Sequence, residues 1–468
     1  MPRHSFPEGF RWGVATSAAQ IEGARDEAGR GESIWDRFAA GPGTIGDGSS
    51  PSVACDHYHR RRDDVGLMAW LGLDTYRFSI AWPRVVPDGI GAVSADGLDF
   101  YDALVDDLLG AGIEPFPTLY HWDLPQALQD RGGWASRDTA EAFVDYCVAV
   151  TRRLGDRVRH WTTHNEPWCV ATLGHEEGQH APGHRDPAEA LRVAHHLLLS
   201  HGWAAGAIRR DVPAAEVGIV LIHTPAYPAT DSEADREAAR WFDGFFNRWY
   251  LDPVFRGSYP ADAVADRIAR GHLEGPEPPF VQNGDLAAIA SPLDFLGLNY
   301  YSRVIMRAGP DGRPTAVKPA PAPDLTAMGW EVFPEGLFAS LRRIHLEYRP
   351  ARIDITENGA AYDDPPPDDD GSIEDHARIA YVRDHLLAVR RAIAAGVPVR
   401  SYFLWSLLDN FEWSHGYEKR FGLFAVDRET RQRTRKASAT WYRDVVAANA
   451  VVDAPTPSSR GESRAIDP

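Results

Sequence analysis

The sequence predicts an α/β fold and, within that class, a single-domain (β/α)₈ or TIM barrel. Eight short runs of strand-forming residues recur along the chain, and longer amphipathic segments separate many of them. Such alternation is typical of parallel strands joined by crossover helices. No internal repeat and no linker divides the 468 residues, so eight units in one chain favour a closed barrel over an open sheet.

The expected elements follow the chain in order. The strands are expected at Arg11–Ser17, Asp74–Ile80, Glu114–Tyr120, His160–Asn165, Val217–His223, Leu293–Tyr301, Arg352–Glu357 and Val399–Leu408. The helices are expected at Gly97–Ala111, Thr139–Leu154, Pro187–Arg210, Glu233–Tyr250, Glu335–Tyr348 and His376–Ala395. Longer loops are expected at Gly41–Asp56, Gly174–Asp186, Arg307–Gly329, Ala360–Ser372 and Asn410–Phe421.

Two segments have compositions that predict exposure to solvent. The Pro- and Asp-rich residues Asp363–Asp370 predict a solvated surface loop. The Pro/Ser-rich residues 453–468 predict a disordered tail, which leaves residues 1–452 for the barrel.

Charge and cysteine content exclude several classes of partner. The formal net charge of −18 argues against nucleic acid and against an anionic membrane surface. No apolar run reaches membrane-spanning length, and the first residues lack the apolar stretch of a signal peptide. Cys55, Cys147 and Cys169 are too few and too scattered for a disulfide framework, so we expect a reduced, cytoplasmic setting.

Two carboxylates follow strand-like runs in a similar way. Glu166 ends the run that begins at His160, and Pro167 disfavours the helical conformation at Glu166, which predicts extended backbone there. Glu357 ends a second apolar run and precedes Asn358. Two strand-end carboxylates are the minimum equipment for cleaving a glycosidic bond.

Polar and aromatic residues also lie at the ends of the expected strands. These residues are Gln20, Trp82, His121, Asn165, His223, Asn299, Tyr301 and Trp405. Barrel active sites are built from the C-terminal ends of strands, so their agreement in position predicts one functional mouth.

Taken together, six motifs resemble those of glycoside hydrolase family 1, the β-glucosidase family, from about Phe6 to Tyr442. They are Phe6–Gly23 (FPEGFRWGVATSAAQIEG), Tyr76–Arg84 (YRFSIAWPR), Thr163–Pro167 (THNEP), Leu298–Ser302 (LNYYS), Ile355–Gly359 (ITENG) and Trp405–Trp413 (WSLLDNFEW). The resemblance implies a retaining mechanism, with Glu357 as nucleophile and Glu166 as acid/base catalyst. Arg77 and Tyr301 match residues that stabilise the nucleophile's anion.

The same resemblance implies the sugar-binding residues. Asn165 is expected to bind the 2-hydroxyl, and Gln20, His121, Glu412 and Trp413 are expected to bind the remaining hydroxyls. Trp405 is expected to form the stacking floor, Trp122 a wall, Asn299 a support for the nucleophile region and Phe421 a closure near C6.

Trp168, Trp330 and Leu173 resemble residues of the family's aglycone channel, with the loop His175–His184 beside them. A narrow entrance between Trp168 and Leu173 leads to the hypothesis of reduced inhibition by glucose. Local packing of variable loops is the competing interpretation for these residues.

Several rival functions are weighed on residues that are present. Glu412 would repel a sugar phosphate, and the presence of Glu166 disfavours a myrosinase-type enzyme. Neither Asp56–His59 nor the set His175, Glu176, His180 and His184 has a tight metal-ligand spacing, and no Gly-rich phosphate loop follows a strand, so neither a metal nor another cofactor is expected. A non-catalytic sugar-binding barrel and an enzyme acting mainly as a transglycosidase stay as alternatives.

The expected partners are small β-glycosides or short oligosaccharides such as cellobiose, with neither nucleic acid nor membrane. The sequence leaves open the choice among glucose, galactose and fucose, the aglycone, and the oligomeric state, a homo-oligomer included.

Overall fold

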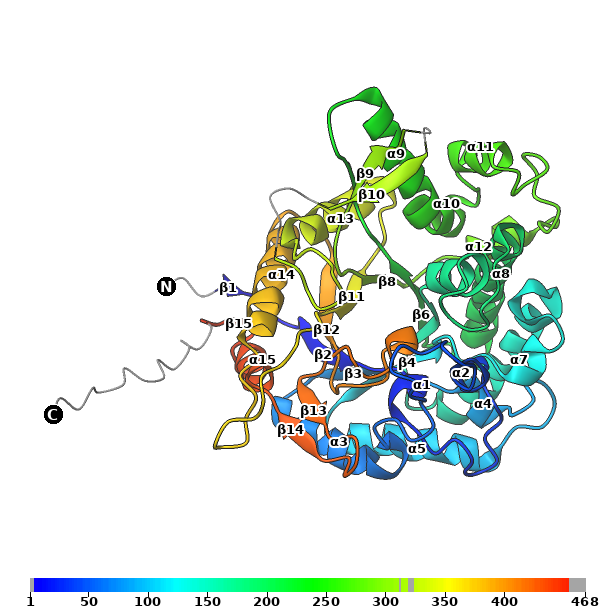
Figure 1. The fold of residues 1–468 in the computed structure, drawn as a ribbon. Helices are drawn as coiled ribbons and strands as arrows, with labels where there is room; N and C mark the ends of the chain where they lie inside the picture. The colour runs from blue at the N-terminus through cyan, green and yellow to red at the C-terminus, as the bar shows by residue number, and fades with distance from the viewer. Residues whose placement is uncertain (1–3, 311–312, 319–323, 454–468) are drawn as a thin grey trace.

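In the computed structural model, which describes residues 4–310, 313–318 and 324–453, eight parallel strands close into a barrel (Figure 1). The strands are β2 (Arg11–Ala15), β3 (Thr75–Ser79), β4 (Glu114–Tyr120), β5 (His160–Asn165), β6 (Glu216–Ile222), β8 (Phe295–Asn299), β11 (Ile353–Asn358) and β12 (Val399–Trp405). β12 pairs with β2 in parallel and so closes the ring. The predicted (β/α)₈ barrel and all eight predicted strands are confirmed.

Helices surround the barrel, as Figure 1 shows. They are α1 (Ala18–Ile21), α2 (Ile34–Ala39), α3 (His57–Leu71), α4 (Trp82–Val85), α5 (Ala95–Gly110), α6 (Gln126–Gln129), α7 (Arg137–Leu154), α8 (Pro187–Asp211), α9 (Glu233–Asp243), α10 (Trp249–Arg256), α11 (Ala261–Ala269), α12 (Asp285–Ile289), α13 (Pro334–Glu347), α14 (His376–Ala394) and α15 (Ala437–Ala448). Short 3₁₀ and π turns lie at η1 (Gly133–Ala135), η2 (Cys169–Glu176), η3 (Gly244–Arg248) and η4 (Trp413–His415). The predicted helix Glu233–Tyr250 is divided into α9, the π turn η3 and the start of α10.

Helix α7 shows how local sequence builds these elements. The Ser136 side chain accepts a hydrogen bond from a first-turn N–H and so caps the helix. Phe143, Cys147, Val150 and Leu154 are buried and recur every three or four residues, which places them on one face. That face packs inward, and the helix therefore covers the barrel.

Small sheets form outside the barrel. They are β1 (His4–Ser5) with β15 (Ala450–Val451), β7 (Ala226–Pro228) with β9 (Val304–Ala308) and β10 (Pro314–Val317), and β13 (Phe424–Val426) with β14 (Arg433–Arg435). The prediction of one loop over Arg307–Gly329 is therefore wrong where β9 and β10 pair, because a hairpin satisfies the backbone there. Residues 454–468, the predicted tail, lie outside the described residues.

The predicted solvated loop Asp363–Asp370 is corrected at one position. The Asp364 side chain is buried, at 1% exposure, and forms ion pairs with Arg378 and Lys436, which are also buried. Two buried cations must be neutralised by carboxylates. Asp364 therefore serves the interior, although its neighbours in the sequence are polar.

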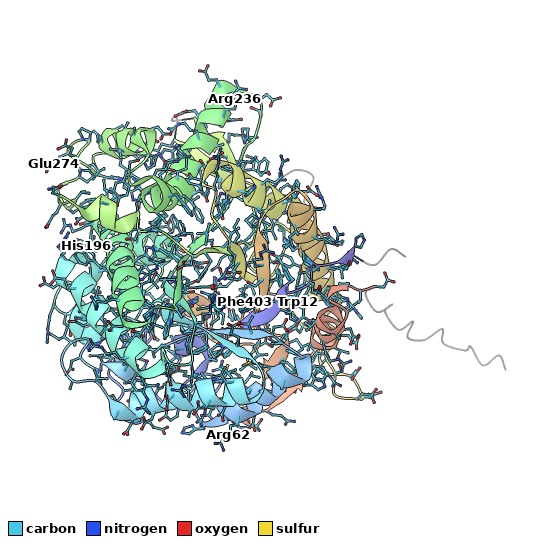
Figure 2. The ribbon with its side chains drawn as sticks, turned by 180° about the vertical axis from the view of Figure 1, so that it is seen from behind. Trp12, Arg62, His196, Arg236, Glu274 and Phe403 are labelled. Carbon is cyan, nitrogen blue, oxygen red and sulfur yellow. The ribbon has the colours of Figure 1, made fainter. Side chains whose placement is uncertain are left out.

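Aromatic side chains fill the barrel near the N-terminal ends of its strands. Phe116 packs against Phe295 and Phe403 with ring centroids 5.2 and 5.1 Å away. Figure 2 shows Trp12 and Phe403 in the interior, while Arg62 and Glu274 point outward. The barrel is thus a packed core with side chains left free to form a site at its opposite end. Among the described residues, no helix combines the length and apolar character needed to cross a membrane.

Candidate active site

The C-terminal ends of the strands meet at a cavity of about 450 Å³. Many residues predicted from the sequence line it: His121, Trp122, Glu166, Trp168, Leu173, Tyr301, Trp330, Glu357, Trp405, Glu412, Trp413 and Phe421. They come from segments far apart in the chain, and the barrel alone brings them together. The predicted mouth and the cavity therefore coincide.

Glu357 lies on β11 at the base of this cavity and is held from two sides. Its Oε1 accepts a hydrogen bond from Arg77 at 2.6 Å, and its Oε2 accepts one from the Tyr301 hydroxyl at 2.6 Å. Arg77 lies on β3 and is completely buried. The guanidinium charge and the phenol both stabilise the ionised carboxylate and orient it. Glu357 therefore has the setting of an anionic nucleophile.

Glu166 follows β5 directly, but its backbone is not extended as predicted. Its φ of 47° lies in the left-handed region. The Glu166 N–H still bonds to the Val220 carbonyl of β6, whereas the Glu166 carbonyl already accepts from Cys169 in the following turn. One residue must therefore reverse the chain between strand and turn, and this overrides the preference that Pro167 imposes.

The Glu166 carboxyl group has neutral partners. Asn299 Nδ2 donates to Oε1 at 2.7 Å, and the Cys169 thiol donates to Oε2 at 3.1 Å. Burial, with the negative charge of Glu357 added to it, raises the pKa of Glu166 to about 8. The group is thus largely protonated at neutral pH and can act as an acid.

A hydrogen-bonded network behind the cavity ties the two carboxylates to one frame. Arg77 also donates to Asn165 Oδ1 at 2.7 Å, and Asn299 donates to the same oxygen at 3.2 Å. Asn165 Nδ2 lies 3.1 Å from His121 Nε2. Arg77, Asn165 and Asn299 lie behind the side chains that line the cavity.

One wall of the cavity is aromatic. Trp122 and Trp413 pack with centroids 4.5 Å apart, and His121 stacks on Trp405 at 5.9 Å. Trp122 and Trp413 both have positive φ, as Glu166 does. Strained backbone that clusters around one cavity is typical of functional sites.

Glu412 and His121 carry the polar atoms of this wall. Glu412 Oε2 and His121 Nδ1 are buried, and neither forms a hydrogen bond with any residue that the structure describes. Burial, with the charges of Glu357 and Glu166, raises the pKa of Glu412 to about 8. Buried polar atoms normally have partners, so a ligand with hydroxyl groups suits this wall.

Three predicted positions lie elsewhere. Gln20 is buried and donates to Asn410 at 3.0 Å and to the Phe411 carbonyl at 2.9 Å, so it supports the segment before Glu412. Trp82 stacks on Tyr146 in the protein interior, and His223 is buried outside the cavity lining.

The outer part of the cavity is apolar. Trp168 packs against Phe246 with centroids 4.2 Å apart, and Phe246 stacks on Phe242 at 5.0 Å. Sequence reasoning missed both phenylalanines because it treated Glu233–Tyr250 as one covering helix. The signal available was the dense aromatic run around the π turn η3.

Other lining residues escaped the sequence analysis as well. They are Cys169, Ile222, Thr224, Ser302, Arg303, Val304, Met328, Ser414 and His415, whereas Gln179 belongs to the loop His175–His184 that was expected beside the entrance. Most lie on connections outside the motifs, where no local pattern indicates which way a side chain faces.

The histidines weighed as metal ligands lie in separate places. His57 bonds to Asp64 and His59 to Asp56, and neither histidine lines the cavity. His180 lines the cavity, and burial lowers its pKa to about 3. His175 and His184 instead approach Glu189, outside the cavity.

The chain is similar to known proteins over nearly its whole length. The model of the family described as glycosyl hydrolase family 1 matches residues 2–451. "Beta-glucosidase A" of Acetivibrio thermocellus is 46% identical, covering 96% of this chain and 100% of that protein. "Bifunctional beta-D-glucosidase/beta-D-fucosidase" of Bifidobacterium breve is 42% identical, covering 94% and 98%.

A solved structure is equally similar. The family 1 β-glucosidase of Thermotoga maritima, solved in complex with isofagomine lactam, superposes with a TM-score of 0.91 at 45% identity, covering 96% of this chain and all of that one.

Proposed function

The chain belongs to glycosyl hydrolase family 1, and on that premise we propose that it removes terminal β-D-glucosyl residues from the non-reducing ends of β-glycosides. The reaction is a double displacement that retains the anomeric configuration. The observation that carries the proposal is the unequal pair of carboxyl groups, with Glu357 held as an anion by Arg77 and Tyr301 and Glu166 kept protonated.

In the first half-reaction, the Glu357 carboxylate attacks the anomeric carbon and the bond to the aglycone oxygen breaks. Glu166 donates its proton to that oxygen, and the aglycone leaves as an alcohol. The product is a covalent glycosyl ester of Glu357, which no longer carries a negative charge.

In the second half-reaction, Glu166 has lost the repulsion that raised its pKa, because Glu357 is now esterified. Its pKa falls, and the carboxylate takes a proton from water while the water oxygen attacks the anomeric carbon. Glu357 leaves as the carboxylate, and both groups return to their starting states.

Glu412 and His121 are the proposed hydroxyl ligands, with Trp405 as the stacking floor and Asn165 on the 2-hydroxyl. Two buried atoms on the cavity wall, Glu412 Oε2 and His121 Nδ1, support this role because they lack partners among the described residues. The proposed contribution of Gln20 is to hold the segment that presents Glu412.

We extend the proposal to β-D-fucosides, which the Bifidobacterium relative's name includes, and to cellobiose as a natural substrate in the breakdown of cellulose. A cytoplasmic location is proposed because all three cysteines are free, as expected in a reducing compartment. A homo-oligomer stays a prediction.

The test compares initial rates on the p-nitrophenyl β-D-glucoside, galactoside and fucoside and on cellobiose, with the first product's anomer followed by NMR. We expect the glucoside and fucoside to be hydrolysed with β-anomer released first. Release of the α-anomer would contradict the double displacement. Absence of turnover on every substrate would favour a sugar-binding barrel, and a dominance of transfer products would favour the transglycosidase.

A further inference from the structure

A cluster of side chains that could bind a metal ion lies at the loop His175–His184 (the entrance loop), outside the cavity already described. The loop between η2 and α8 closes on itself: the His184 N–H bonds to the Gly174 carbonyl at 2.9 Å, and the Asp186 N–H bonds to the His175 carbonyl at 2.7 Å. Asp186 then caps α8 by accepting hydrogen bonds from two N–H groups of the first turn. These bonds place two histidines against the first turn of α8.

Both imidazoles converge on one carboxylate oxygen. His175 Nδ1 lies 2.6 Å and His184 Nδ1 lies 2.7 Å from Glu189 Oε1. The two rings are nearly perpendicular, at 87°, with centroids 5.2 Å apart. All three donor atoms lie within 4.8 Å of one another.

The cluster has a closed side and an open side. The His175 side chain is buried at 1% exposure, whereas that of His184 is 43% exposed. His184 and Glu189 line a surface groove, so solvent can reach the centre of the cluster. A cation there would have one preformed ligand in the interior and a free position toward the groove.

Among the residues that the structure describes, the ion-pair partners of Glu189 are His175 and His184, and no lysine or arginine pairs with it. A carboxylate oxygen approached by two imidazole nitrogens supplies the ligand types that a divalent cation such as Zn²⁺ takes.

We propose that His175 Nδ1, His184 Nδ1 and Glu189 Oε1 bind one Zn²⁺ ion, with water from the groove as the fourth ligand. Two nitrogens and a carboxylate oxygen are a known ligand set for zinc. When zinc binds, each imidazole carries its proton on Nε2 instead of Nδ1. The three ligand atoms then move apart to about 3.3 Å from one another, the spacing around a tetrahedral ion with bonds of about 2.0–2.1 Å. Glu189 lies outside the sequence spacing considered for His175 and His184, since it belongs to the next helix.

The ion would fasten the entrance loop to α8. Gln179 and His180 of that loop line the catalytic cavity, whereas the three proposed zinc ligands do not, so the zinc site adjoins the entrance but lies outside the cavity. The inference does not depend on the proposed function, because binding is measured without substrate.

The test is equilibrium dialysis of the EDTA-treated full-length protein against ZnCl₂, with bound zinc measured by mass spectrometry. We expect one zinc per chain in the wild type and at least about 100-fold weaker binding in Glu189→Gln and in His184→Gln. His59→Gln is the matched control, because His59 also bonds to carboxylates at the surface but not in a three-ligand cluster. It should bind zinc as the wild type does.

Two further readouts keep the test decisive. Circular dichroism in EDTA establishes that the variants are folded, and zinc should raise the thermal midpoint of the wild type but not of Glu189→Gln. Cobalt should give tetrahedral visible bands without a thiolate charge-transfer band, which excludes Cys169. The zinc site would be overturned if the wild type bound no zinc, or if both variants bound zinc as tightly as the wild type. The three side chains would then form a hydrogen-bonded cluster only.

Discussion

Both ends of the barrel carry carboxylates, but they differ in how many basic side chains pair with those carboxylates. At the N-terminal end, Glu216 pairs with Arg159 and Arg352 and lies 3.2 Å from His160, while Glu114 pairs with Arg11. At the C-terminal end, Glu166, Glu357 and Glu412 line one cavity. Among the described residues, Arg77 is the only arginine or lysine in an ion pair with any of these three.

The consequence is visible in the pKa values. Partial burial alone would raise the pKa of Glu216, but Arg352 and His160 hold it below its usual value. Burial and neighbouring charge raise the pKa of Glu166 and of Glu412 to about 8. Similar side chains thus stabilise the fold where cations match them, and become acids where buried negative charge is in excess.

The largest expected effect comes from removing the anion at the catalytic end. Glu357→Gly should lower kcat on p-nitrophenyl β-D-glucoside by about 10⁴-fold or more, because no nucleophile remains. Azide should restore turnover and give the α-glycosyl azide, since it attacks from the side that Glu357 occupied. A variant that keeps appreciable activity without azide would show that Glu357 is not the nucleophile.

Glu166→Gln removes the general acid, so the loss of activity should depend on how strongly the leaving group needs a proton. We expect a loss of about 10²–10⁴-fold on cellobiose, whose alkoxide needs a proton. Formation of the glycosyl-enzyme from a dinitrophenyl glucoside should change much less, because that leaving group departs without one. Pre-steady-state release of dinitrophenol measures this step, and equal losses on both substrates would contradict the role of an acid.

The raised pKa of Glu166 predicts the pH at which activity falls on the alkaline side of the pH profile. kcat/KM should fall as the pH rises through about 8, because free Glu166 loses its proton there. Asn299→Ala removes a hydrogen bond that favours the ionised form of Glu166, so the limb should move upward by less than about one pH unit. Glu412 forms no hydrogen bond with Asn299. If the alkaline fall of kcat/KM stayed at the same pH in Asn299→Ala, the group that titrates there would be Glu412.

At the N-terminal end, Arg352→Met should affect stability rather than chemistry. Arg352 pairs with Glu216 and donates to the buried Asp354 at 2.9 Å. Its loss should cost about 1–3 kcal/mol of unfolding free energy and lower the thermal midpoint by a few degrees. kcat/KM should stay within about twofold of the wild type. A large loss of kcat/KM in a folded variant would show that the N-terminal end of the barrel also contributes to catalysis.

The smallest expected effect concerns the cavity entrance. Trp168→Ala opens the apolar wall that Trp168 forms with Phe246 and should strengthen inhibition by glucose by about threefold to tenfold. The inhibition constant for glucose, compared with that of Phe255→Ala in the covering helix α10, measures this. Unchanged inhibition would dismiss the hypothesis of a narrow entrance.

How far the sequence predicted this site differs from residue to residue. Glu357, Arg77 and Tyr301 were predicted from motifs, and the structure joins them by direct hydrogen bonds. Phe246 was missed because its orientation depends on a π turn, which hydrophobic periodicity does not reveal. Glu189 was missed as a partner of the histidines because its contact depends on how a loop folds back.

The sequence by itself determined the alternation of strands and helices and the strand ends at which chemistry-bearing residues lie, because periodicity and chain direction are local properties. The tertiary structure alone decided which carboxyl group carries a proton. Glu166 and Glu357 lie on β-strand ends far apart in the chain, and their mutual repulsion, the ion pair of Glu357 with Arg77 and the burial of both carboxyl groups exist only after the barrel closes.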